Sequence, residues 1–176
     1  MNKILALLMA LILAGCGYST KGFTFKETKI IIVPVINTID ITSERRINSD
    51  YETFPRLIEN RLTNELVSKF NIDGHLKVVN QEGPNTLKLT CSVDSYSKEA
   101  LSYVDEDDDN VEEQRLRLYV GMKLESPDGK VMINQTVVGE AEYFLSGANQ
   151  KSESSAQDDL IDDTARRLSE AVLESW

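Results

Sequence analysis

Residues 111–144 read VEEQRLRLYVGMKLESPDGKVMINQTVVGEAEYF, and this stretch decides the fold. In its first half, apolar residues occupy every second position from Leu116 to Leu124 with polar residues between them, which is typical of a half-buried strand. The SPDG sequence at 126–129 combines the fixed φ of proline with a glycine that tolerates positive φ, so the chain should reverse there. The second half places Val131, Ile133 and Val137 on one face. The stretch therefore predicts a long β-hairpin, which needs further strands or a helix against its apolar face.

Three shorter stretches predict the remaining strands. Residues 29–35 read KIIIVPV, a nearly continuous apolar run typical of a strand covered on both faces or close to it. Pro34 cannot donate a hydrogen bond to a neighbouring strand, so it should mark the strand's end or an edge. A short strand is expected at 76–79, and a longer one at 86–96.

Two segments show the 3.6-residue period of amphipathic helices. The first begins near Thr53, has Pro55 in its first turn, and ends at Gly74, which accepts the left-handed conformation past a helix terminus. Its apolar face comprises Phe54, Leu57, Ile58, Leu62 and Leu66. The second helix opens at Ser155 in the style of a capping box, with acidic residues such as Asp163 pointing away from the core. Its apolar face comprises Ala156, Leu160, Ile161, Thr164, Leu168, Ala171 and Val172.

The elements follow one another in the order β-α-β-β-β-β-α. This order predicts an α+β fold in which two helices pack on one face of a four- to five-stranded mixed sheet. The first helix and its flanking strands form a candidate βαβ unit with a right-handed crossover. We expect residues 28–176 to form a single α+β domain with one core.

The first 15 residues show the three-part pattern of an export signal, with an early cation, an apolar run and small residues. The junction Leu13-Ala14-Gly15-Cys16 matches the bacterial lipobox, in which the cysteine receives a diacylglycerol and the signal is cut just before it. An ordinary secretory signal is the alternative. Acyl chains on Cys16 would anchor the protein in a membrane, with residues 16–27 as a tether. Gly17 replaces the aspartate that typically retains such lipoproteins in the inner membrane, so the outer membrane is favoured.

Charge and cysteine content exclude several classes of function. The chain has 19 Lys and Arg against 29 Asp and Glu, a formal net charge of −10, which argues against a nucleic-acid partner because phosphate binding needs clustered basic surface. With Cys16 lipidated, Cys91 would be the only thiol, so no internal disulfide is expected. Cys91 keeps step with apolar neighbours and is interpreted as a small buried hydrophobe.

No cofactor, metal or catalytic site can be assembled from the motifs present. There is no glycine-rich phosphate loop and no metal-binding spacing, and His75 is the only histidine, so the chain is not expected to be an enzyme. The acidic run Asp105–Asp109 resembles the start of a calcium-binding loop, but no glycine follows at the sixth position and the flanks indicate strands. A solvated, mobile hairpin tip is the favoured interpretation.

Several separated motifs resemble the LptE family of lipopolysaccharide-assembly lipoproteins across the mature chain. They are Cys16-Gly17-Tyr18, Ile32-Val33-Pro34-Val35 with Asn37, the helix 57–66, Val78-Val79, Ser95-Tyr96-Ser97, Leu101-Ser102-Tyr103, Arg115-Leu116-Arg117-Leu118, Gly129-Lys130-Val131, Gly139-Glu140 and Tyr143-Phe144. The resemblance implies an outer-membrane lipoprotein, facing the periplasm, that plugs and helps assemble the LptD β-barrel for lipopolysaccharide transport. It implies no catalytic residue.

The expected sheet leaves one face uncovered, with Arg115, Arg117, Tyr119 and Lys123 on it. In the light of the resemblance, this partly basic face is a candidate contact with the barrel wall or with lipopolysaccharide phosphates. An ordinary solvated sheet face is the alternative. Family members that bind lipopolysaccharide are thought to use basic loops, whereas the 105–109 loop here is acidic, which leaves Lys151 as the only basic candidate in the other loop.

Two further classes of function stay open at this point. A periplasmic protein–protein adaptor, such as a lipoprotein that activates a peptidoglycan synthase, also begins its domain with a strand ending in a Val-Pro-like pair and a helix. A small-ligand-binding lipoprotein would need a lined pocket, which a sequence does not show. The long hairpin followed by one terminal helix favours the plug.

Overall fold

A computed structural model of the chain describes residues 29–39, 57–103 and 111–174, which form an α+β fold. The predicted signal peptide, Cys16 with its tether, the acidic run Asp105–Asp109 and the first residues of the predicted 53–74 helix lie outside the described residues. The elements are β1 (Lys29–Ile32), β2 (Ile36–Asn37), α3 (Ile58–Asp73), β3 (Lys77–Val78), β4 (Thr86–Tyr103), β5 (Val111–Glu125), β6 (Val131–Phe144) and α4 (Glu153–Leu173).

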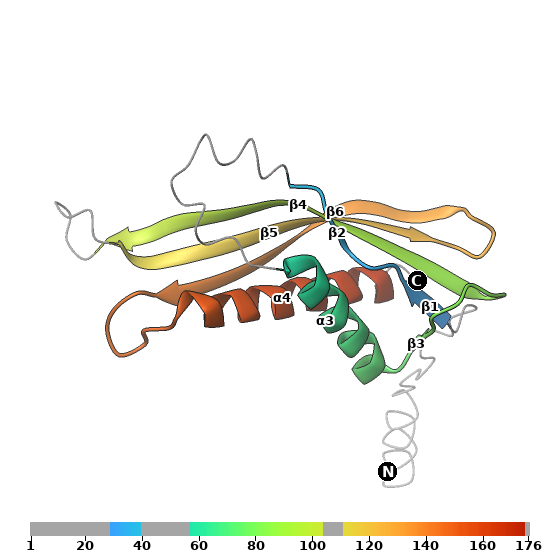
Figure 1. The fold of residues 1–176 in the computed structure, drawn as a ribbon, viewed down its shortest axis with the longest axis horizontal. Coiled ribbons are helices and arrows are strands. Elements are labelled where there is room, and N and C mark those ends of the chain that lie inside the picture. Colours follow the sequence, from blue (N-terminus) through green and yellow to red (C-terminus); the bar gives the residue numbers. More distant parts are fainter. Residues whose placement is uncertain (1–28, 40–56, 104–110, 175–176) are drawn as a thin grey trace, which may run out of the picture.

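The predicted order of elements is confirmed, with one change at the first strand. Strand β1 ends two residues before Pro34, in line with the expected strand end there, and an additional short strand, β2, follows the proline; both strands pair with β4. The sheet order is β3-β1-β4-β5-β6, with β2 beside β4. Pairing is parallel among β3, β1 and β4 and antiparallel from β4 through β6, so the predicted mixed sheet is also confirmed (Figure 1).

The central hairpin forms where its alternation predicts. The even-numbered residues from Leu116 to Leu124 are buried on β5, and Gly129 has a φ of +81° at the reversal. The Gly129 amide donates to the Ser126 carbonyl at 2.9 Å, and the Ser126 amide donates to the Lys130 carbonyl at 2.9 Å. These two hydrogen bonds close the turn, and the β5–β6 register shifts by one residue between Glu125 and Leu124, just beyond it.

Strand β4 is longer than its sequence pattern predicts. It continues beyond residue 96 to Tyr103, and its register against β5 shifts between Val93 and Ser95. This bulge exchanges the two faces of the strand, because an extra residue reverses the alternation of side chains. The apolar pattern therefore breaks at Asp94 although the strand does not end.

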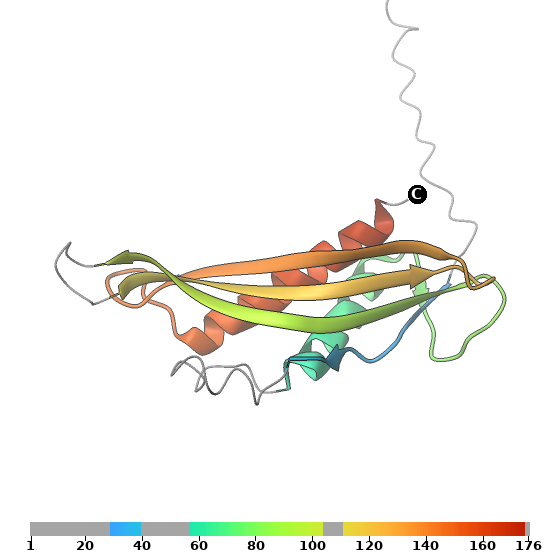
Figure 2. The same cartoon turned by 90° about the horizontal axis from the view of Figure 1, so that it is seen from above.

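Both helices cover the same face of the sheet, as predicted, and the core lies between the two layers (Figures 1 and 2). On α4 the predicted apolar face is buried, apart from Ala171, which is partly buried. The buried residues of α3 are Ile58, Leu62, Leu66 and Phe70. None of the helices in the described ranges is long and apolar enough to cross a membrane.

Two predictions about helix starts are wrong. Leu57 is the N-cap of α3, with a φ of 54°, and its side chain is exposed instead of joining the apolar face. Helix α4 begins at Glu153, not at Ser155, because the Ser152 hydroxyl accepts a hydrogen bond from the Ser155 amide at 3.2 Å and acts as the cap.

Candidate functional site

The sheet face opposite the helices carries the predicted contact residues of β5. Because the buried residues of this strand are even-numbered, Arg115, Arg117, Tyr119 and Lys123 project from the uncovered face. All four are partly exposed. The alternation therefore places them together, as expected, and their role as contacts stays a prediction.

The two arginines form a ladder of ion pairs across three strands. Arg115 lies opposite Glu142 of β6, and its Nε and Nη2 donate to Oε1 of that carboxylate at 2.8 and 2.5 Å. Arg117 lies opposite Glu140 and donates from Nε to Oε1 at 2.7 Å. Its Nη1 also donates to Oε2 of Glu99 on β4 at 2.8 Å. These contacts join the N-terminal part of β5 to the C-terminal parts of β4 and β6.

The ion pair between Arg117 and Glu140 stabilises the charged forms of both groups. The hydrogen bond from Arg117 lowers the pKa of Glu140, and it raises the pKa of Arg117. Glu140 therefore stays ionised to lower pH and Arg117 to higher pH, which preserves this one ion pair over a wide pH range.

A shallow hollow of about 490 Å³ lies on this face beside the ladder. Its polar lining includes Thr90, Ser92, Asp94, Lys123, Asn134 and Thr136. The Asp94 carboxylate accepts a hydrogen bond from the Ser92 hydroxyl at 2.8 Å, and Lys123 Nζ lies 2.8 Å from Oε1 of Glu125. The charged groups of the hollow are therefore also partnered.

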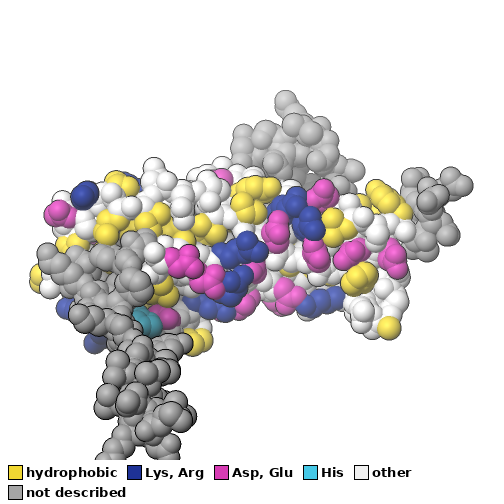
Figure 3. Space-filling view, turned by 180° about the vertical axis from the view of Figure 1, so that it is seen from behind, with side chains coloured by type: hydrophobic (Ala, Val, Ile, Leu, Met, Phe, Trp, Pro, Cys, Tyr) yellow, Lys and Arg dark blue, Asp and Glu magenta, His cyan; other side chains and the backbone are white. Residues whose placement is uncertain are grey.

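This pairing corrects the expectation of a partly basic face. Each predicted cation of β5 has a carboxylate beside it, contributed by Glu99, Glu125, Glu140 or Glu142. The side of the molecule seen from behind, which is not the uncovered face itself, also shows acidic and basic side chains interspersed (Figure 3). Each of these cations is thus already paired with a carboxylate, which weakens the face as a site for free phosphate groups.

Lys151 is not brought together with the residues of β5. It precedes α4, where its amide donates to the Phe144 carbonyl at 3.0 Å and its ammonium pairs with Asp159 of the helix. The predicted lipidation residue, Cys16, lies outside the described residues. The candidate site within the described ranges is therefore the uncovered face of β4, β5 and β6.

The structure reveals a structural contact between α4 and β6 that the sequence pattern does not predict. Asp163 was expected to point away from the core, but its Oδ2 accepts the Glu140 backbone amide of β6 at 2.9 Å. It also receives hydrogen bonds from Arg166 at 2.5 Å and Arg167 at 2.7 Å. Helix α4 is thereby fastened to the edge of the sheet next to the ion-pair ladder.

Replacing Asp163 tests this contact. Partial burial acts to raise the pKa of Asp163, but the Glu140 amide with Arg166 and Arg167 outweighs it, so the net pKa is lowered. We expect Asp163→Ala to reduce the free energy of unfolding by about 2 kcal/mol at pH 7, since a charge-assisted hydrogen bond is lost. Urea unfolding followed by circular dichroism measures this.

The pH dependence of the effect has a definite sign. A carboxylate whose pKa is lower in the folded state stabilises the fold above its unfolded pKa, near 3.9, and loses that contribution as pH falls through the folded pKa. The difference in unfolding free energy between the natural protein and Asp163→Ala should therefore shrink below about pH 4. A difference that stays constant down to pH 3 would contradict a lowered pKa of Asp163 in the folded state.

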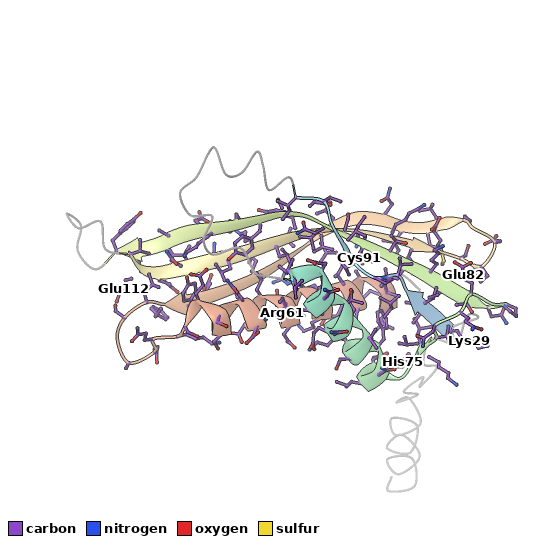
Figure 4. The ribbon with its side chains drawn as sticks, in the orientation of Figure 1. Lys29, Arg61, His75, Glu82, Cys91 and Glu112 are labelled. Carbon is purple, nitrogen blue, oxygen red and sulfur yellow. The ribbon has the colours of Figure 1, made fainter. Side chains whose placement is uncertain are left out.

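Cys91 does not have the surroundings of a catalytic thiol, and His75 is an exposed residue. Burial in the core raises the pKa of the Cys91 thiol to about 12, so the thiolate is scarce, and the prediction that it is a buried hydrophobe is confirmed (Figure 4). His75 lies past the end of α3, where Nδ1 is 2.8 Å from Oδ2 of Asp73. No group of three potential metal ligands occurs among the described residues.

The sequence matches the family model described as LptE, lipopolysaccharide-assembly, over residues 37–175. The chain belongs to the LptE family. The resemblance inferred from the sequence motifs is thereby confirmed, and the family is one of lipopolysaccharide-assembly lipoproteins. No curated protein matches this LptE-family chain.

Solved structures with a similar fold come from several bacteria. A hypothetical protein from Chlamydia trachomatis has a TM-score of 0.55 at 12% identity, covering 85% of this chain and 97% of that one. A protein from Xanthomonas campestris has the same TM-score and identity, covering 84% of each chain. The rare lipoprotein B from Shewanella oneidensis has a TM-score of 0.49 at 12% identity, covering 82% and 95%. At these identities the likeness to the first two shows the shared fold alone.

Proposed function

We propose that this chain is an outer-membrane lipoprotein that plugs the LptD β-barrel and assists its assembly for transport of lipopolysaccharide to the cell surface. The match to the LptE family over residues 37–175 carries the proposal. In this role residues 1–15 are removed as a signal peptide, Cys16 carries the lipid anchor, and residues 16–27 tether the domain on the periplasmic side.

The uncovered sheet face suits a protein that sits inside a polar barrel. The lumen of an outer-membrane barrel is polar, so a plug must present polar groups whose charges are already compensated. The ladder of Arg115 and Arg117 with their carboxylates meets this condition, because burial of a paired ion costs less than burial of a lone one. We place the barrel contacts on Arg115, Arg117, Tyr119 and Lys123, with Lys151 as a separate contact at the base of α4.

The domain acts in this proposal by binding, without catalysis. The paired charges favour contact with the polar wall of the barrel over capture of free lipid phosphates. Lipopolysaccharide is the cargo of the complex, and the chain itself contributes shape and polar surface to the barrel's interior.

Purification of the lipidated protein from outer membranes in mild detergent tests the proposal. We expect a single large β-barrel to co-purify at equal stoichiometry, identified by mass and by heat-modifiable gel mobility. Recovery of a penicillin-binding protein, or of self-oligomers alone, would overturn the plug and favour the adaptor class. Depletion in cells gives a second readout, since the plug predicts misassembled barrel and the adaptor predicts cell-wall defects with the barrel intact.

A further inference from the structure

Strand β6 forms one edge of the sheet, and only half of that edge is covered in the described ranges. Near its C-terminal end the Glu140 amide donates to Asp163 of α4, and the Phe144 carbonyl accepts from Lys151. Both groups point away from β5. Backbone groups of an antiparallel strand alternate in direction, so the even-numbered residues between Ile133 and Phe144 present their amides and carbonyls at the edge.

By this alternation Asn134, Thr136 and Val138 offer unpaired backbone groups to a neighbouring strand. In the part of the chain that the structure describes, no backbone or side-chain group hydrogen bonds to these amides and carbonyls from outside the sheet. We call residues Val131–Val138 the open edge. It lies in the half of β6 that extends toward the β5–β6 turn, away from the covered end (Figure 1).

The composition of the open edge is unusual for an exposed strand. Val131–Val138 reads VMINQTVV and contains no charge, no proline and no glycine, in a chain of which 27% is charged. Val131 is 44% exposed and Met132 37% exposed. Soluble proteins usually protect exposed edges with charges, prolines or bulges, and here a register shift at the very start of β6 is the only such device.

The surroundings of the open edge favour a lone strand over a second copy of this chain. Helix α4 crosses diagonally beneath β6, and its C-terminal end emerges beyond the edge (Figure 2). A second copy would bring its own α4 to the same place. The acidic residues Glu170 and Glu174, which lie at the C-terminal end of the helix, would then be present in both copies. A single extended segment avoids both conflicts and would lie beside β6 with the end of α4 beneath it, as in peptide-binding domains that add a strand to a sheet.

We propose that the open edge binds an extended, uncharged segment of the barrel partner as an additional β-strand. Charged side chains on that segment would find no counter-charge along VMINQTVV and would be desolvated at a cost, so the segment facing it is uncharged. The proposal rests on the function proposed above and names where the partner adds to the sheet.

A proline at Thr136 separates this contact from the stability of the fold. The Thr136 amide points out of the sheet, so Thr136→Pro removes a donor for an added strand without breaking the β5–β6 ladder. Thr136→Ala removes the side chain and keeps the amide, which makes it the matched control. In co-purification from outer membranes, we expect Thr136→Pro to reduce recovered barrel at least about tenfold, and Thr136→Ala to reduce it by much less because the backbone donor is kept.

Hydrogen exchange on the unmodified protein keeps the proposal testable if Thr136→Pro does not fold. The amides of Asn134, Thr136 and Val138 should exchange freely in the isolated lipidated protein and become protected in the complex. Equal barrel recovery with Thr136→Pro, or free exchange within the complex, would overturn the added strand while leaving the plug intact. If no barrel co-purified with the natural protein, both the plug and the added strand would be overturned. If the natural protein formed a homodimer that Thr136→Pro dispersed, the strand bound at the open edge would be that of a second copy and not a barrel segment.

Discussion

Gly139→Ala is expected to reduce the free energy of unfolding by about 3 kcal/mol, a large effect for the addition of one methyl group. A Cβ at residue 139 would lie 1.9 Å from Oγ1 and 2.9 Å from Cα of Thr164 on α4. The Thr164 hydroxyl already donates to the Leu160 carbonyl at 2.6 Å, and a backbone Cα cannot rotate away. Relief of the overlap would require α4 to move off the sheet.

Gly121→Ala on the neighbouring strand is the matched control. A Cβ there would meet Asp94 Oδ2 at 2.8 Å and Ser92 Oγ at 2.9 Å, which are the ends of side chains that can turn into solvent. We expect a change within about 0.5 kcal/mol. Urea unfolding followed by circular dichroism compares the two variants. Equal effects would show that residue 139 does not determine how closely α4 packs on β6.

The hairpin was predictable because its signals are local. Alternation from Leu116 to Leu124 and the turn ending at Gly129 depend only on neighbouring residues, and both are confirmed. The bulge after Val93 has no such signal, and it reverses the faces of β4, so the strand's last third was missed. The start of α4 was misplaced because Ser152 and Ser155 are both plausible caps, and only the three-dimensional hydrogen bond distinguishes them.

The sequence predicts on which face of the sheet the candidate site lies, but it does not predict the charge of that face. Period-two spacing places Arg115 and Arg117 on the uncovered face, but their partners come from other strands. The pairing of Arg117 with Glu99 depends on the bulge in β4, which lies outside any local pattern. The contact between Asp163 and the Glu140 amide joins a helix to a strand edge. The outward position of Asp163 on a helical wheel does not predict this contact.

Helix α3 supplies the second large expected effect, at Phe70. The side chain is fully buried, whereas Ile72 on the same helical turn is 79% exposed. Phe70 was not among the apolar residues predicted for this helix, although it continues their spacing one turn further. Its carbonyl accepts the Gly74 amide at 3.0 Å, so it lies in the last turn of α3, where the chain leaves the helix for β3.

Phe70→Ala is expected to reduce the free energy of unfolding by about 4 kcal/mol, because the lost transfer energy adds to the cost of a cavity. Ile72→Ala should change it by less than about 0.5 kcal/mol, since an exposed side chain is solvated in both states. Both substitutions leave alanine in the same helix and so affect helix propensity little. Urea unfolding of the two variants measures the contrast. A small effect at residue 70 would mean that α3 contributes little to the core, and that β5, β6 and α4 hold the fold without it.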